Sequence, residues 1–157
     1  MVLEMAGKTD PGLFRAGAGR AVITPPVGFV IDGPEHGARN STGVLDDLLA
    51  RVIVLESKGT RVVLVSLDVW GLSPALSSSI RAEAGKAASV DESSIWITAT
   101  GNATSPPLWR DDPQYANYSS YLPEQIAGAV TMALGALEPA SMGSTGTLLP
   151  GVSTFIA

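Results

Sequence analysis

Two short apolar segments flank one helix-forming segment, and this arrangement constrains the fold more than any other feature of the sequence. Residues 61–68 (RVVLVSLD) and 95–99 (IWITA) are rich in β-branched and aromatic residues, as is typical of buried strands. Between them, Ser73-Pro74 predicts a helix that continues to about Ala88, because serine caps free amides and proline suits the first turn. The strand–helix–strand unit predicts an α/β fold.

Further strands and a second helix are expected on both sides of this unit. Residues 48–55 predict an apolar strand that forms a hairpin with residues 61–68 through a turn at Lys58-Gly59, and we expect the second strand to be buried on both faces. A helix is predicted from about Leu122 to Leu137, where apolar residues recur at helical spacing before Pro139. The other expected segments are a loose tail (1–12), a strand (15–24), an irregular connection (25–37), a loop (101–120) and a strand or pair of strands (142–157).

Composition narrows the functional classes. The 157 residues suffice for about one domain, and 45% of them are hydrophobic, so a folded chain is expected. The net charge of −5 and the lack of a cationic cluster argue against nucleic-acid binding. There is no cysteine, and no segment is apolar for long enough to span a bilayer or to form a signal peptide. We therefore expect a cytoplasmic protein without a membrane span.

Polar side chains follow the apolar strands, where α/β proteins most often carry their chemistry. Asn102 and nearby backbone N–H groups suit an oxyanion hole, because glycine at position 101 lets a carbonyl approach closely. Asp68 suits either an acid or base or an arginine partner. The catalytic candidates are Asp68, Thr100, Asn102, Thr104 and Ser105, and the candidates for substrate binding are Gly101, Trp109 and Tyr115.

Several alternative sites are weaker. Asp46-Asp47 is more typical of a helix or turn signal than of a catalytic pair, and the tyrosines and Trp109 suit either a substrate pocket or a protein interface. The glycine-rich residues 16–20 precede a strand rather than joining a strand to a helix, so we reject a dinucleotide loop.

Four segments, in order and with matching separations, resemble the neutral/alkaline (non-lysosomal) ceramidase family. They are residues 16–26 (AGAGRAVITPP), 43–51 (GVLDDLLAR), 65–68 (VSLD) and 97–100 (ITAT). The resemblance extends from about residue 13 to residue 157 but covers only the N-terminal part of the family's longer catalytic domain. It implies mixed β-sheets covered by helices and completed by a further chain or by the missing C-terminal part. It also implies an amide substrate with an apolar tail.

The zinc-site histidines of that family are not present. In the "THtH" segment that the family shows after this strand, Gly101 and Ala103 stand in their places, and neither ligates a metal. His36 is the only histidine and lies far away in the sequence. We therefore expect no metal and no cofactor.

Three functions follow from this combination. In the first, the chain is a subunit or fragment of a ceramidase-like hydrolase that cleaves a linear amide bond. The apolar end, Thr154–Ala157, then indicates a processed precursor whose following chain supplies the nucleophile, giving a heterodimer or higher oligomer. In the second, it is a catalytically inactive binding module. In the third, it is a metal-dependent hydrolase whose site is rearranged around His36, aspartates and a partner.

Overall fold

A five-stranded mixed sheet, in the order β6-β5-β4-β1-β7, forms the centre of the protein. The computed structural model describes residues 14–33, 37–144 and 146. The strands of this sheet are β1 (Phe14–Val22), β4 (Leu49–Ser57), β5 (Thr60–Leu67), β6 (Ile95–Ala99) and β7 (Glu138–Pro139). With its helices, the sheet confirms the predicted α/β class.

The hairpin and the strand–helix–strand unit both form as predicted. Strands β4 and β5 pair antiparallel, and the turn residues Lys58 and Gly59 have φ angles of 50° and 80°, as two-residue hairpin turns require. Strand β6 lies parallel to β5 after a crossover through α1 (Pro74–Ala88) and a short 3-10 helix (Glu92–Ser94). The Ser73 hydroxyl accepts a hydrogen bond from the Leu76 N–H and caps α1.

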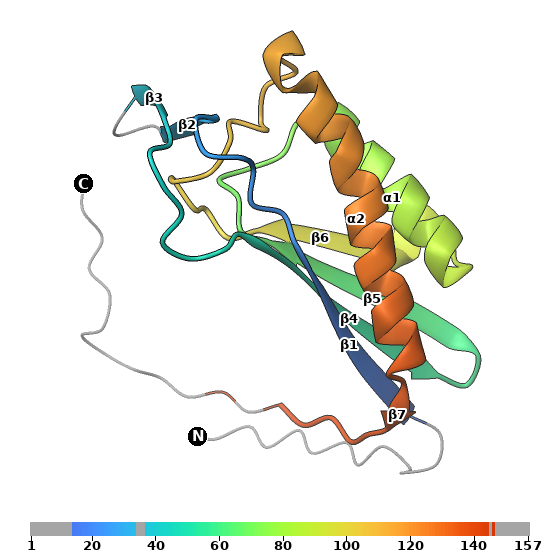
Figure 1. Ribbon diagram of the computed structural model, residues 1–157. Coiled ribbons are helices and arrows are strands. Elements are labelled where there is room, and N and C mark those ends of the chain that lie inside the picture. Colours follow the sequence, from blue (N-terminus) through green and yellow to red (C-terminus); the bar gives the residue numbers. More distant parts are fainter. Residues whose placement is uncertain (1–13, 34–36, 145, 147–157) are drawn as a thin grey trace.

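Both helices cover the same face of the sheet (Figure 1). Helix α2 (Ala116–Gly135) crosses β1 very closely. This is possible because Gly17 and Gly19, which have no side chain, lie at the contact with the helix. A Cβ atom built at Gly19 would lie 2.1 Å from the Ala129 carbonyl oxygen. The core fills the space between this face and the helices with small and branched side chains, among them Ala50, Val52, Val65, Ile80, Ile126 and Val130.

The second helix differs from the prediction at both ends. It begins at Ala116 rather than near Leu122, follows a 3-10 turn (Pro113–Tyr115), and ends at Gly135 rather than at 137. Pro123 lies inside it, so the Ser119 carbonyl loses the usual helical N–H donor. Leu122 and Pro123 are both buried, and this packing offsets the missing hydrogen bond. The expected loop after β6 is correspondingly shorter.

The connection expected to be irregular contains a second, two-stranded sheet. Strand β2 (Val30–Gly33) pairs antiparallel with β3 (Gly37–Asn40). Contacts with residues distant in the sequence hold this β2–β3 hairpin in place: the centroid of the Phe29 ring lies 5.5 Å from that of Tyr115 and 5.3 Å from that of Tyr118. The local sequence does not predict the hairpin, because the tyrosines that pack against Phe29 lie almost ninety residues further along the chain.

The opposite face of the main sheet has no helix over it among the described residues. Strand β5 is therefore buried on one face, through Val63, Val65 and Leu67, and only half-buried on the other, contrary to the expectation of burial on both. Ile53 and Trp96 are 46% and 63% exposed on this uncovered face.

Some predictions fall outside the described residues. The N-terminal tail (1–12), His36 and most of the strand or strands expected within 142–157 belong to this group. They remain predictions.

Candidate functional site

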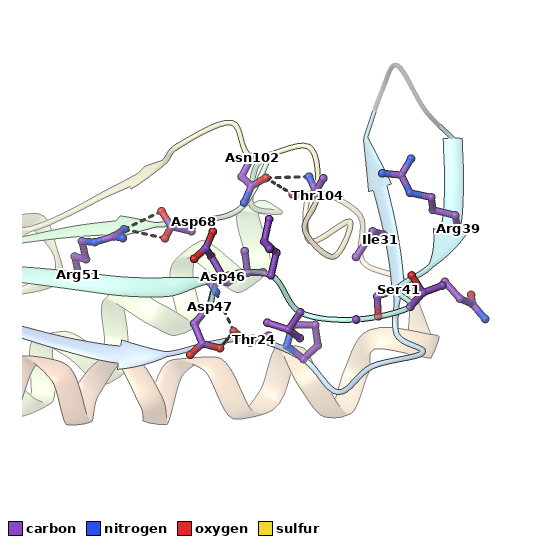
Figure 2. Close-up of a pocket in the computed structure, with 17 residues that line it drawn as sticks. Thr24, Ile31, Arg39, Ser41, Asp46, Asp47, Arg51, Asp68, Asn102 and Thr104 are labelled. Atoms are coloured by element: carbon purple, nitrogen blue, oxygen red, sulfur yellow. Dashed lines mark hydrogen bonds and ion pairs between the residues drawn. The ribbon is translucent and has the colours of Figure 1, made fainter.

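Four neighbouring strands place residues at one end of the main sheet. Strands β1, β5 and β6 finish at this end, and the antiparallel strand β4 begins there. A cleft of about 680 Å³ opens at this end of the sheet, between the strand ends and the β2–β3 hairpin (Figure 2). Its lining comprises Thr24, Pro25, Ile31, residues 39–48, Arg51, Asp68, Asn102 and Thr104.

Asp68, directly after β5, is bound on both carboxylate oxygens. Arg51 Nη1 lies 2.8 Å from Oδ2 and 2.9 Å from Oδ1, and the Leu49 N–H donates to Oδ2 at 3.1 Å. Of the two roles open to Asp68 from the sequence, the geometry favours the arginine partner, which joins β5 to the start of β4. A catalytic role for Asp68 stays a prediction.

Asn102 and Thr104 form a tight turn after β6 that faces the cleft. The Thr104 backbone N–H and hydroxyl donate to Asn102 Oδ1 at 2.9 and 2.8 Å. Both bonds engage the oxygen of the amide, so the Asn102 side-chain nitrogen lies on the side away from Thr104 (Figure 2). Among the described residues the side-chain N–H groups of Asn102 have no acceptor, so both donors are left for a group inside the cleft.

Ser105 is fully buried and joins two loops. Its hydroxyl donates to the Asn102 carbonyl at 2.8 Å and accepts from the Trp70 N–H at 2.9 Å. These bonds tie the loop after β6 to the loop after β5 and hold Asn102 in position. Ser105 does not line the cleft.

The other candidate residues lie outside the lining of the cleft. Thr100 and Gly101 are exposed at the end of β6, and Gly101 has a φ of 78°. Trp109 packs edge-on against Trp70, with ring centroids 6.4 Å apart. Tyr115 is 4% exposed and supports Phe29 at the base of the β2–β3 hairpin. Of the predicted site residues, the structure brings Asp68, Asn102 and Thr104 together.

Two contributors to the cleft, Thr24 and Arg39, were not recognised from the sequence. Thr24 donates its hydroxyl to Asp47 Oδ1 at 2.7 Å and accepts from the Leu48 N–H at 2.9 Å, which ties the end of β1 to the start of β4. Arg39, exposed on β3, lines the cleft on its hairpin side (Figure 2). The double proline at residues 25–26 marks the exit from β1 in the sequence, but the strand order that brings Thr24 to Asp47 is not encoded locally.

A partly buried tyrosine ties the end of β1 to α2. Tyr118 donates its hydroxyl to the Ile23 carbonyl, and burial raises the pKa of this phenol. The raised pKa keeps the hydroxyl protonated and able to donate at any physiological pH. The contact therefore holds the end of β1, and with it Thr24, against α2.

No cluster of three or more His, Cys, Asp or Glu side chains that suits a metal ion occurs within the described part of the chain. Asp46, Asp47 and Asp68 line the same cleft, but they do not converge. The metal-dependent alternative depends on His36, which is not among the described residues.

The fold is shared with solved ceramidase structures. The chain superposes on the neutral ceramidase from Pseudomonas aeruginosa with a TM-score of 0.70 and 21% identity, over 81% of this chain and 22% of that one. It superposes on a ceramidase solved in complex with C2 with a TM-score of 0.66 and 20% identity, over the same shares of both chains. No protein-family profile and no curated protein sequence matches the chain. It thus has the fold of part of a ceramidase and spans about a fifth of the length of those proteins.

Proposed function

We propose that this chain is the part of a ceramidase-like hydrolase that binds and polarises a linear amide for cleavage. The observation that carries the proposal is the side-chain nitrogen of Asn102, which has no partner among the described residues and lies in a cleft at the strand ends of a ceramidase-like fold. The two hydrogen bonds from Thr104 to the amide oxygen fix the orientation of the Asn102 side chain. Its N–H donors are therefore pre-organised, because they need not reorient when negative charge develops on the substrate.

The chemistry follows from this position. A hydroxyl or thiol nucleophile adds to the amide carbon, and the carbonyl oxygen becomes an oxyanion that the Asn102 side-chain N–H groups stabilise. The C–N bond then breaks, and the departing amine takes up the proton that the nucleophile lost. Water cleaves the resulting ester or thioester to give a carboxylic acid and restores the nucleophile.

The nucleophile itself comes from another polypeptide segment in this proposal. Thr104 has its hydroxyl proton engaged by Asn102, and Ser105 is buried. Among the described residues, neither hydroxyl contacts a carboxylate or an imidazole that would activate it. A nucleophile needs such a base within hydrogen-bond reach, so it enters with a second segment.

A second segment also suits the exposed face of the main sheet. Ala18, Ile53, Leu64 and Trp96 lie in register across four strands on the side opposite the helices. Covering such an apolar row stabilises a sheet, and the solved proteins of this fold are several times longer than this chain.

Native and denaturing mass spectrometry of protein produced from the complete gene tests the proposal first. We expect a second polypeptide that co-purifies with this chain and begins with Ser, Thr or Cys. The purified assembly should release a fatty acid from a series of N-acyl amines. An assembly of that composition without hydrolysis of any linear amide would contradict the proposed reaction.

One observation favours a second candidate function, an inactive binding module. The candidate hydroxyl groups have no base beside them in the described structure, and Asp68 is held by Arg51. In this alternative the cleft binds an amide without cleaving it. An intact assembly that binds N-acyl amines and leaves them unchanged would support it.

A further inference from the structure

Arg39 places on one wall of the cleft a positive charge that no described residue neutralises. It lies on β3 directly opposite Ile31 of β2, and both residues line the cleft. The other cleft cation, Arg51, is committed to Asp68 at 2.8 Å. Within residues 14–33, 37–144 and 146, Arg39 forms no side-chain hydrogen bond or ion pair.

The β2–β3 hairpin that carries Arg39 is anchored rather than free. The Gly28 N–H donates to the Ser41 carbonyl at 2.9 Å, and the Ser41 N–H returns a bond to the Phe29 carbonyl at 2.9 Å. Phe29 packs in turn against Tyr115 and Tyr118. Since its base is fixed to α2, the hairpin holds Arg39 at a defined side of the cleft.

The charges on the cleft walls are separated. Asp46 and Asp47 lie toward the sheet, whereas Arg39 and Ile31 lie on the hairpin side, with Asn102 and Thr104 between the two sides (Figure 2). Asp47 accepts from Thr24, and Asp46 has no partner among the described residues. A ligand that reaches Asn102 therefore meets a cation on its hairpin side.

We propose that Arg39 is a specificity-determining residue that binds a carboxylate on the amide substrate, so that the preferred substrate class is an N-acyl amino acid. A single guanidinium matches a carboxylate through two parallel N–H donors. A phosphate dianion fits less well, because the described lining supplies no second free cation, and the aspartates repel a double charge. The inference deepens the proposed function and rests on it.

Equilibrium binding of uncleavable probes tests this inference separately from catalysis. The probes are N-(hexylsulfonyl)glycine and its uncharged glycinamide, in which a sulfonamide replaces the scissile amide. Protein from the complete gene should bind the carboxylate probe about tenfold more tightly than the amide probe. The preference should shrink as salt is raised, because the cleft is open to solvent.

Three variants complete the test. Arg39→Gln should abolish the preference, and Arg39→Lys should keep part of it, because lysine retains the charge without the two-pronged geometry. Arg20→Gln is the matched control: Arg20 is exposed on β1, outside the cleft, and its variant should keep the full preference. Equal binding of the two probes, binding of neither, or an unchanged preference in Arg39→Gln overturns the inference. Hydrolysis of uncharged amides with no preference for a carboxylate would uphold the proposed function while rejecting this role of Arg39.

Discussion

In the proposed function, the oxygen and the nitrogen of the Asn102 side chain have different roles, so the two roles can be tested separately. Its oxygen accepts two bonds from Thr104 and shapes the turn, and its nitrogen faces the cleft. Asn102→Asp keeps the acceptor and removes the N–H donors. We expect kcat for amide hydrolysis to fall by about 10²–10³-fold, with the free energy of unfolding changed by less than about 0.5 kcal/mol.

The matched control for this prediction is Asn117→Ala. Asn117 is exposed on α2, and its side chain makes no hydrogen bond in the described structure. If the proposed function holds, the assembled protein should keep its kcat for amide hydrolysis in this variant. Unchanged kcat in Asn102→Asp would show that the oxyanion is stabilised elsewhere.

Glu56 gives the sheet a pH-dependent contribution to stability. Hydrogen bonds from Arg61 hold the pKa of this carboxyl below its usual 4.5, against an opposing effect of burial, with a smaller contribution from the charge of Arg15. The folded state therefore binds fewer protons than the unfolded state as the pH falls through this range. The stabilisation is present above about pH 4.5 and is lost below it.

Urea unfolding at pH 7 and pH 3 checks this expectation. Glu56→Gln should lower the free energy of unfolding by about 1 kcal/mol at pH 7, and much less at pH 3. Glu83→Gln removes a more exposed pair with Lys86 and should change stability by less than about 0.5 kcal/mol at either pH. An equal loss for Glu56→Gln at both pH values would exclude a charge effect.

At the scale of elements, the contact between β1 and α2 depends on the absence of two side chains. The Cβ of an alanine at position 19 would lie 2.1 Å from the Ala129 carbonyl oxygen and 2.8 Å from the Ala133 nitrogen. These are backbone atoms that cannot rotate away, so helix and strand must separate. We expect Gly19→Ala to cost about 3 kcal/mol in thermal or urea unfolding.

A second glycine supplies the control. Gly128 lies on the exposed side of α2, and a Cβ built there meets no atom within 4 Å. Gly128→Ala should stabilise the protein by about 0.5–1 kcal/mol, because alanine has the higher helix propensity. Destabilisation by both variants to the same degree would show that close packing at β1 is not the cause.

The elements that the sequence predicts well are those whose signals are local. The β4–β5 hairpin depends on neighbouring apolar segments and on Lys58-Gly59, and α1 depends on Ser73-Pro74. The β2–β3 hairpin was missed because its stability comes from Phe29 against distant tyrosines. Likewise, Asn102 and Asp68 each follow a recognisable strand, whereas Thr24 and Arg39 reach the cleft only through strand order and hairpin docking. Sequence patterns do not contain that information.

At the scale of the whole molecule, the uncovered face of the main sheet carries a polar row of side chains next to an apolar row. One row across the sheet is polar and contains Arg20, Arg51, Ser66 and Thr98. The next row is Ala18, Ile53, Leu64 and Trp96, of which Trp96 is 63% exposed. Since apolar area stabilises an interface and the polar row adjoins Asp68, a covering segment would rest on the apolar row and leave the cleft open.

This division gives the last prediction. In the assembled protein, the backbone amides of β6 should exchange hydrogen much more slowly than in the 157-residue chain alone, and the fluorescence of Trp96 should shift to shorter wavelength. The double variant Ile53→Lys/Trp96→Lys should leave this chain folded but abolish its co-purification with the second polypeptide, because two buried charges would remain unpaired. Tyr121→Lys, on an exposed site of α2, is the control and should leave assembly intact. Normal assembly of the double variant would mean that the second segment binds elsewhere, at the edge of β6 or on the helices.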